Sequence, residues 1–400
     1  MQSVKFTLLS LIITFAVSVS AQTASLQINE ICPSNIDQWV DPSFNYGGWV
    51  ELYNPTSTTI DITGWYLSDN RDKLQKARVT QTTSVPAKGF TTLWFDHYSK
   101  WSTQTIDMKL DCDGGKLYLS DAQGNLVASL EYPEAISRCS WARTKDGGNV
   151  WNYCANPSPG KTNAGRKFAT ERLEAPEIDT PSQVFSSTRI SWKVTIPRGC
   201  TLRYTTDGSA PTESNGHRSQ TGSFSATVTC TYRFRLFRDG YLPSPVVTRT
   251  FIRNDLDIDL PILSVTGTQD NFYGDSLGIF VKGVNGRPGY GQSENCNWNM
   301  DWERPSVFEY FTADGELLFA QEAGIERSGG STRAVLPASF KIKANKRYEG
   351  QGHLLYPFFE EKPYLKHKTV QIRTVHKRIS IVRESSLDYL RFALHQLAEL

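Results

Sequence analysis

The stretch GIERSGGSTRAVLPASFKIK contains residue types that could hold a phosphate group. Gly329 and Gly330 have no Cβ atom, so their backbone N–H groups could approach phosphate oxygens closely. Arg333 could donate two parallel hydrogen bonds to such a group. Lys341 and Lys343 lie two residues apart, so on a strand they share one face. The Gly-Gly pair is also typical of a hairpin turn between two strands, and the residues alone leave both interpretations open.

Other candidate chemistry in the sequence is sparse. Asp207 and Asp239 could be taken for the paired carboxylates of a glycosidase, but each precedes a glycine where a turn is expected, and this favours a turn role. The chain has no CxxC motif, and its six histidines are scattered without ligand spacing. The sequence therefore predicts no catalytic residue and no metal site.

The elements that would position these residues are mainly β-strands. Four hundred residues are too many for a single core, so two to four domains are expected. Short aromatic and β-branched runs alternate with clusters of Gly, Asn, Asp and Pro, which predicts antiparallel β structure. A formal net charge of +2 indicates neither a nucleic-acid binder nor a membrane-surface protein.

The N-terminus has the pattern of a signal peptide. Lys5 precedes an apolar run over residues 6–19, and Val19-Ser20-Ala21 is a small-x-small cleavage site. We expect a signal peptide over residues 1–21 and a secreted or cell-surface protein; an uncleaved anchor helix is the alternative. No later segment is long and apolar enough to cross a bilayer, so no transmembrane segment is expected after cleavage.

Export would permit disulfides among the seven cysteines. Cys139 and Cys154 flank a segment centred on a DGG turn, so a hairpin would bring them face to face, and we predict this pair. Cys200 and Cys230 lie in one predicted module and form a second candidate pair. An odd count leaves at least one thiol unpaired within the chain. The sequence does not determine how three cysteines are paired: Cys32, Cys112 and Cys296.

The pattern of residues 25–165 predicts a β-sandwich. An irregular segment, NPSPGKTNAG, closes this sandwich and is called the strap. Four tryptophans could be ligand-stacking platforms, although core packing is the favoured interpretation: Trp49, Trp65, Trp141 and Trp151. The segment resembles the lamin tail domain family through INEI, GWVELYNP, TGWYLSDN, LYLSD, SWAR followed by DGG, and PSPG. That resemblance implies an immunoglobulin-like fold with an attachment or organising role.

The pattern of residues 174–252 predicts a second, smaller sandwich. Two of its strands end at Asp-Gly turns, which lie in the motifs TLRYTTDGSAPT and TYRFRLFRDGYLPSP. These two motifs resemble the small immunoglobulin-like module at the C-terminal end of chitobiase-type hexosaminidases. The resemblance implies a spacer module, and no glycosidase site carries over.

Residues 258–400 resemble the N-terminal part of the CotH family of secreted, kinase-like proteins, through LPILSV, GIFVKG, WERPSVFEYF, GELLFAQEAGI and GGSTR. The resemblance implies phosphorylation of Ser or Thr with ATP and Mg²⁺, which acidic residues bind beyond the matched region. Ala338 and Ser328 depart from the family pattern. Near the end, ESSLDYLRFALHQLAEL has leucines spaced by three and four, which predicts an amphipathic helix and, because the pattern stops midway, an incomplete domain.

The sequence thus predicts a mainly β protein with two immunoglobulin-like sandwiches in tandem and an incomplete α+β kinase-like lobe. Two sandwiches without a catalytic constellation favour an exported binding or scaffold protein, whose partner is a surface polymer, a glycan or a protein, with no cofactor for the chain as given. The alternative is a secreted ATP-dependent Ser/Thr kinase whose catalytic half lies beyond residue 400. A glycan-processing enzyme is a third hypothesis, and it lacks an acid pair.

Overall fold

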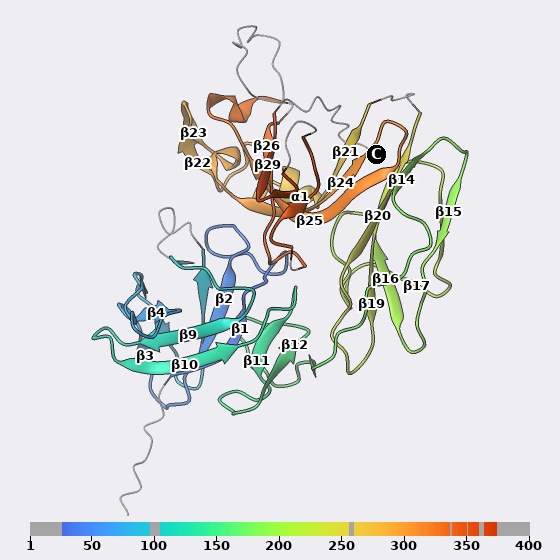
Figure 1. Cartoon of the computed structure of the whole chain (residues 1–400). Coiled ribbons are helices and arrows are strands. Elements are labelled where there is room, and N and C mark those ends of the chain that lie inside the picture. The colour runs from blue at the N-terminus through green and yellow to red at the C-terminus, as the bar shows by residue number, and fades with distance from the viewer. Residues whose placement is uncertain are drawn as a thin grey trace, which may run out of the picture.

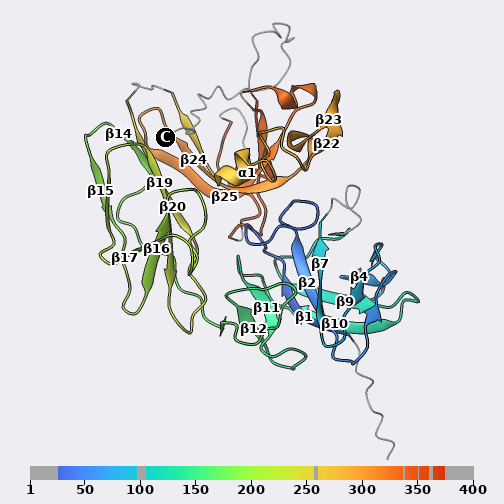
Figure 2. The same cartoon turned by 180° about the vertical axis from the view of Figure 1, so that it is seen from behind.

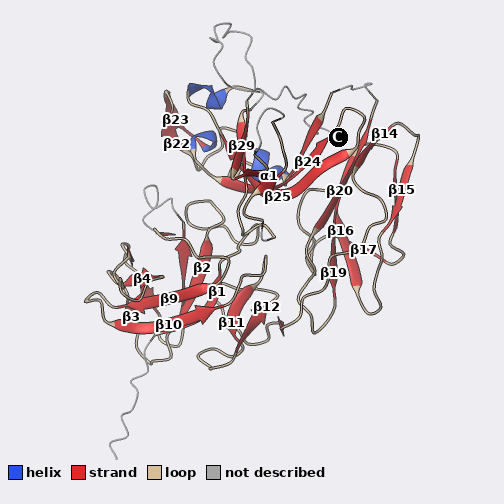
Figure 3. Ribbon diagram, viewed as in Figure 1, coloured by secondary structure: helices blue, strands red, loops and turns tan. Residues whose placement is uncertain are grey.

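The computed structural model describes residues 26–96, 105–255, 260–336, 338–349, 351–359 and 364–373. The predicted signal peptide and the predicted C-terminal helix lie outside these residues. The chain folds into three β modules, coloured blue to teal, green to yellow, and orange to red along the chain (Figure 1). Strands dominate and helices are few (Figure 3), so the predicted mainly β fold is confirmed.

The first module packs a large sheet against a smaller one. The large sheet has the order β13-β12-β11-β1-β2-β7-β8, and the smaller has the order β10-β9-β4-β5, with β3 and β6 pairing separately. The strands are β1 (Gln27–Cys32), β2 (Gly48–Tyr53), β3 (Ile60–Asp61), β4 (Tyr66–Ser68), β5 (Ala77–Arg78), β6 (Ser84–Val85), β7 (Phe90–Phe95), β8 (Thr105–Ile106), β9 (Gly115–Ser120), β10 (Leu126–Tyr132), β11 (Ser140–Arg143), β12 (Trp151–Cys154) and β13 (Phe168–Ala169).

The tryptophans of this module belong to its interior, as the favoured interpretation expects. Trp49 is fully buried, and Trp65, Trp141 and Trp151 are partly buried against the core. The rings of Trp141 and Trp151 stack at an interplanar angle of 14°. These side chains therefore pack into the sandwich and stabilise it.

Polar residues from the motifs that resemble the lamin tail domain lie close together where the strap crosses the large sheet. The Glu51 carboxylate accepts hydrogen bonds from Asn29 Nδ2 at 2.9 Å and from the backbone N–H of Gly160 at 2.8 Å. Asp146, in the turn after β11, accepts from Asn29 Nδ2 at 3.0 Å and from the Asn163 backbone N–H at 2.9 Å. INEI, GWVELYNP, DGG and PSPG are thus parts of one buried polar cluster that holds the strap in place.

The second module is a five-stranded sheet in the order β14-β20-β19-β16-β17, faced by the pair β15-β18. Its core stacks Trp192 on Phe251 with ring centroids 4.2 Å apart. Gly208 has a φ of +79°, and Asp207 accepts a hydrogen bond from the Ser209 backbone N–H at 3.0 Å, so the predicted turn role of Asp207 is confirmed. The strands are β14 (Gln183–Phe185), β15 (Ile190–Lys193), β16 (Thr201–Thr205), β17 (His217–Ser219), β18 (Ser223–Ala226), β19 (Cys230–Phe237) and β20 (Val247–Arg253).

The third module is a five-stranded sheet in the order β21-β24-β25-β26-β29, with two short hairpins and few helical turns. Its elements are β21 (Ile262–Thr266), α1 (Gln269–Tyr273), β22 (Arg287–Gly289), β23 (Gln292–Cys296), the 3₁₀ turn η2 (Asn297–Asn299), β24 (Glu303–Phe311), β25 (Leu317–Arg327), the 3₁₀ turn η3 (Ser331–Ala334), β26 (Phe340–Lys343), β27 (Leu354–Leu355), β28 (Lys366–His367) and β29 (Thr369–Ile372).

The modules pack against each other. The long hairpin β24–β25 lies beside β14 and β20 in both views (Figures 1 and 2). The hairpin turn is joined to the second module by a hydrogen bond of 3.0 Å from the Val184 backbone N–H to the Gly315 carbonyl oxygen. Leu242 of the second module is fully buried with Cys139 and Ala169 of the first. Each module therefore buries surface against another one.

The two predicted disulfides are absent, and all seven cysteines are free thiols. The predicted hairpin between Cys139 and Cys154 exists, but its register places Ser140, not Cys139, opposite Cys154. Cys200 precedes Thr201, which pairs with Phe237 at the far end of β19 from Cys230. Seven residues of strand separate these ends by about 23 Å, whereas a disulfide needs Cα atoms within about 7 Å, so this prediction is wrong.

The buried carboxyls of the first module predict an unusual pH dependence of stability. Burial raises the pKa of Glu30 to about 7 and that of Glu51 to about 8, from 4.5 for each. Both groups hold their proton to a higher pH in the folded state than in the unfolded chain. Their contribution to stability is therefore complete below about pH 4.5 and is lost as the pH rises through about 7 and 8.

We predict that the free energy of unfolding, measured by urea titration, falls between about pH 5 and pH 7 with a slope of about 1.4 kcal/mol per pH unit for each group. Glu51→Gln removes one group and reduces the slope by about 1.4 kcal/mol per pH unit. Glu131→Gln, at a side chain that is 77% exposed, is the matched control and leaves the slope unchanged. A wild-type stability that is flat over this pH range would contradict the assignment.

Candidate binding site at the junction of the three modules

The Gly-Gly stretch forms the connection between β25 and η3, and its arginine is committed to internal contacts. Gly329 has a φ of +116°, a conformation that favours glycine. The buried Arg333 guanidinium donates hydrogen bonds to the Gly329 carbonyl oxygen at 2.9 Å, to the Trp298 carbonyl oxygen at 2.9 Å and to Asp301 Oδ1 at 3.0 Å. It also lies 4.2 Å from the ring centroid of Tyr290. Arg333 therefore fastens the loop instead of facing a ligand.

The two lysines share one face of β26, as their spacing predicts. Lys341 Nζ lies 3.1 Å from Glu326 Oε1, and Lys343 Nζ lies 2.8 Å from Glu326 Oε2. Lys343 also lies 3.3 Å from Glu303 Oε2. The structure thus brings the two lysines together on a carboxylate of the neighbouring strand. No hydrogen bond or ion pair within the described residues joins them to Arg333, and the phosphate contacts predicted for Gly329, Gly330, Arg333, Lys341 and Lys343 stay a prediction.

Within the part of the chain that the structure describes, no group of three or more His, Cys, Asp or Glu side chains could hold a metal ion. Five lysines and arginines of the third module form ion pairs with carboxylates of the same module: Lys282, Arg333, Lys341, Lys343 and Arg347. The candidate ligand site lies between the modules.

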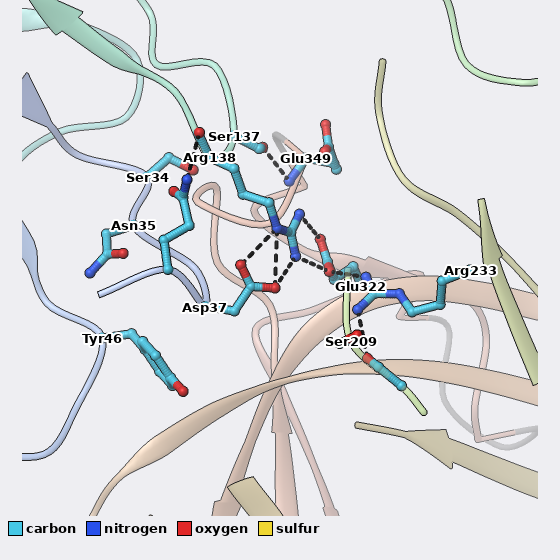
Figure 4. A network of polar contacts seen from close by, with 12 residues as sticks. Ser34, Asn35, Asp37, Tyr46, Ser137, Arg138, Ser209, Arg233, Glu322 and Glu349 are labelled. Carbon is cyan, nitrogen blue, oxygen red and sulfur yellow. Dashed lines mark hydrogen bonds and ion pairs between the residues drawn. The ribbon is translucent and has the colours of Figure 1, made fainter. Parts of the chain in front are cut away.

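A single carboxylate, Glu322 of β25, joins all three modules (Figure 4). Its Oε1 lies 2.8 Å from Arg138 Nη2 of the first module and 2.7 Å from Arg233 Nη2 of the second. Arg138 also forms an ion pair of 2.8 Å with Asp37 Oδ2. The four charges are largely buried, so they interact through a medium of low polarity.

The local backbone holds Arg138 in position for this network. Its φ of +63° lies in the left-handed region, and its backbone N–H donates to the Ser34 carbonyl oxygen at 3.1 Å. Its own carbonyl oxygen accepts from Gln38 Nε2 at 3.1 Å. Burial alone would raise the pKa of Glu322, but the guanidinium groups of Arg138 and Arg233 lower it to about 2. The carboxylate is therefore charged at neutral pH.

Further polar contacts extend the junction on both sides. Arg172, in the segment between the first two modules, forms a bidentate pair with Glu349, with both N–O distances at 3.1 Å. Arg347 Nη1 donates to the Tyr46 carbonyl oxygen at 2.7 Å, and Trp302 Nε1 donates to the Ser43 carbonyl oxygen at 2.8 Å. These bonds fix the third module on loops of the first.

Around this network the three modules enclose a cavity of about 1160 Å³. Its wall includes Asp37 and Trp39 of the first module, Arg235 and Tyr241 of the second, and Asp270 of the third. No module alone surrounds it, so its shape depends on the junction. A pocket of this size with aromatic groups and a few convergent polar groups is the usual form of a ligand site.

Four charged side chains of the cavity wall are joined in two ion pairs. Arg138 pairs with Asp37, and Lys167 Nζ pairs with Glu213 Oε1 at 2.7 Å. Arg235 is different: its Nε donates to the Ser244 carbonyl oxygen at 2.9 Å, and no carboxylate of the described residues pairs with it. Burial, together with the nearby Arg138, lowers the pKa of Arg235 to about 10.

Sequence reasoning missed this site because its members are far apart in the chain. Arg138 and Glu322 are separated by 184 positions, and Arg233 and Glu322 by 89. One local signal was present. Arg233 and Arg235 alternate with apolar residues in the run YRFRLF, and a charged face on a strand this apolar indicates a partner surface.

Comparison with known proteins supports the assignment of the first module only. Residues 19–134 match the family model of the Lamin Tail Domain. No curated protein has a matching sequence. Among solved structures, the human OSCAR ligand-binding domain aligns with 55% of this chain and 97% of its own at 12% identity, with a TM-score of 0.14. A similarity this low informs neither the fold nor the ligand.

We predict that Glu322→Gln lowers the free energy of unfolding by about 3–5 kcal/mol, because two buried guanidinium groups lose their shared counter-charge. Denaturant titration measures this loss. The matched control is Glu213→Gln, which breaks an exposed ion pair between the first two modules and costs at most about 1 kcal/mol. Equal effects of the two substitutions would show that the buried network does not hold the junction.

Proposed function

We propose that the chain is a binding or scaffold protein whose three β modules act as one body and hold a ligand in the cavity between them. The observation that carries this proposal is the position of Glu322, which pairs with an arginine of each other module beside the cavity. An arrangement fixed by buried ion pairs keeps the cavity wall preorganised, so little conformational entropy is lost on binding.

The kinase alternative has less support in the geometry. Arg333 pairs with Asp301, and Lys341 and Lys343 pair with Glu326. A nucleotide would have to displace these carboxylates before its phosphates could reach the cations. The observed contacts favour stabilisation of the third module over phosphoryl transfer by the residues that the structure describes.

Export to the cell surface or the medium is part of the proposal and is supported by the pattern of residues 1–21. None of the helices that the structure describes is long and apolar enough to span a membrane. The ligand we propose is therefore a polymer, glycan or protein met outside the cytoplasm, and the lamin-tail-like module supports an attachment role.

A substitution at the cavity wall tests this function. We expect the wild-type protein to be retained on at least one member of an array of cell-wall polymers, host glycans and extracellular proteins. Ser214→Trp places a large ring at an exposed position of the wall and should weaken retention roughly tenfold without lowering the melting temperature. Ser186→Trp, at an exposed serine outside the cavity, is the control and should change neither property.

A wild-type protein that no member of the array retains would contradict a binding function. Full retention of the Ser214→Trp variant would instead show that the ligand binds elsewhere on the molecule.

A further inference from the structure

Resting on this proposed function, we propose that the ligand is an acidic saccharide and that Arg235 binds its carboxylate inside the cavity. Arg235 lies on β19, close to the centre of the junction. Residues Phe234 and Leu236 on either side of it point into the core of the second module. The alternation of the strand therefore turns Arg233 and Arg235 together toward the other two modules.

The two arginines differ in what they meet there. Arg233 donates to the Gly208 carbonyl oxygen at 3.0 Å and pairs with Glu322 at 2.7 Å. Arg235 uses only its Nε atom, toward Ser244, and its two Nη groups have neither a hydrogen-bond acceptor nor a carboxylate among the described residues. It is nevertheless only 5% exposed and forms part of the cavity wall.

A largely buried guanidinium without a carboxylate at ion-pair distance is costly, and proteins usually provide a partner. Glu349 is near enough to raise the pKa of Arg235 but forms its ion pair with Arg172. Here the free Nη groups lie at a cavity, so a ligand can supply that partner. Two parallel N–H donors match a carboxylate, whose two oxygens accept them side by side.

The surroundings of Arg235 suit a sugar that bears the carboxylate. Trp39 is 37% exposed and lines the cavity, and its backbone N–H and carbonyl oxygen both form hydrogen bonds with the Asn35 side chain, which holds its backbone in place. Tyr241, held under the Arg238 guanidinium at 4.7 Å, adds a second aromatic group. Aromatic faces stack against the apolar face of a sugar ring.

The loop at the cavity rim supplies hydroxyl and amide groups through Thr212, Ser214 and Asn215, which can exchange hydrogen bonds with sugar hydroxyls. Asp37 and Glu213 of the wall form ion pairs with Arg138 and Lys167, which limits their repulsion of an acidic ligand. The wall also contains Asp207, Asp239 and Asp270, and Asp239 lies 3.8 Å from Lys167.

The test uses two oligosaccharides that differ only in charge: a galacturonic acid oligomer and its fully methyl-esterified form. Titration calorimetry of the full chain at pH 7 and low salt should show the acid form binding at least tenfold more tightly than the ester. Arg235→Gln should abolish that difference and leave the melting temperature unchanged or higher, because it removes a buried charge without a partner. Arg218→Gln, at an exposed arginine of the second module outside the cavity wall, should change the affinity less than threefold.

Three outcomes would overturn the inference. Equal binding of acid and ester, or tight binding of the acid by the Arg235→Gln variant, would remove the role of Arg235. Failure of the wild type to bind either oligomer, while the polymer array retains the protein, would refute the acidic saccharide and leave the binding function standing. Arg235-dependent binding of a hexaglutamate peptide in place of the oligosaccharide would assign the site to acidic peptides.

Discussion

The arrangement of the molecule depends on one buried carboxylate. Glu322 accepts from Arg138 of the first module and from Arg233 of the second while it belongs to the third, so its position is defined only when all three are assembled. Removal of Glu322 leaves the buried Arg233 guanidinium without a carboxylate partner, which costs several kcal/mol in typical proteins. This constraint opposes any hinge motion that would separate the modules around it, and it makes the cavity a fixed feature of the chain.

The same constraint explains why the site looks as it does. The three β modules leave a space where they meet. Strand residues alternate between the module core and the outer face, and charged residues of those outer faces line the space. Asp37 and Glu322 neutralise Arg138 and Arg233, whereas Arg235, on the same strand face, has no such partner. An arginine that is paired with a carboxylate, such as Arg138 or Arg233, has a structural role. Arg235, which has no such pair, is the one proposed to bind the ligand.

The sequence predicted what depends on neighbouring residues along the chain. The β runs, the Asp207 turn and the shared face of Lys341 and Lys343 follow from local periodicity and were confirmed, and the match of residues 19–134 supports the first module. Contacts between residues far apart in the sequence were harder to predict. A shift of one residue put Ser140 opposite Cys154, and nothing near Glu322 in LLFAQEAGIER indicates its partners. The resemblances to the chitobiase-type module and to the CotH family stay predictions.

Because Glu322 joins the three modules, we expect them to unfold as one unit. Differential scanning calorimetry of the wild-type chain and of Glu322→Ala tests this directly. The wild type should show one transition with equal van't Hoff and calorimetric enthalpies, and the variant should show two or more transitions at lower temperature. A wild-type chain whose modules melt in separate transitions, unchanged by the substitution, would contradict it.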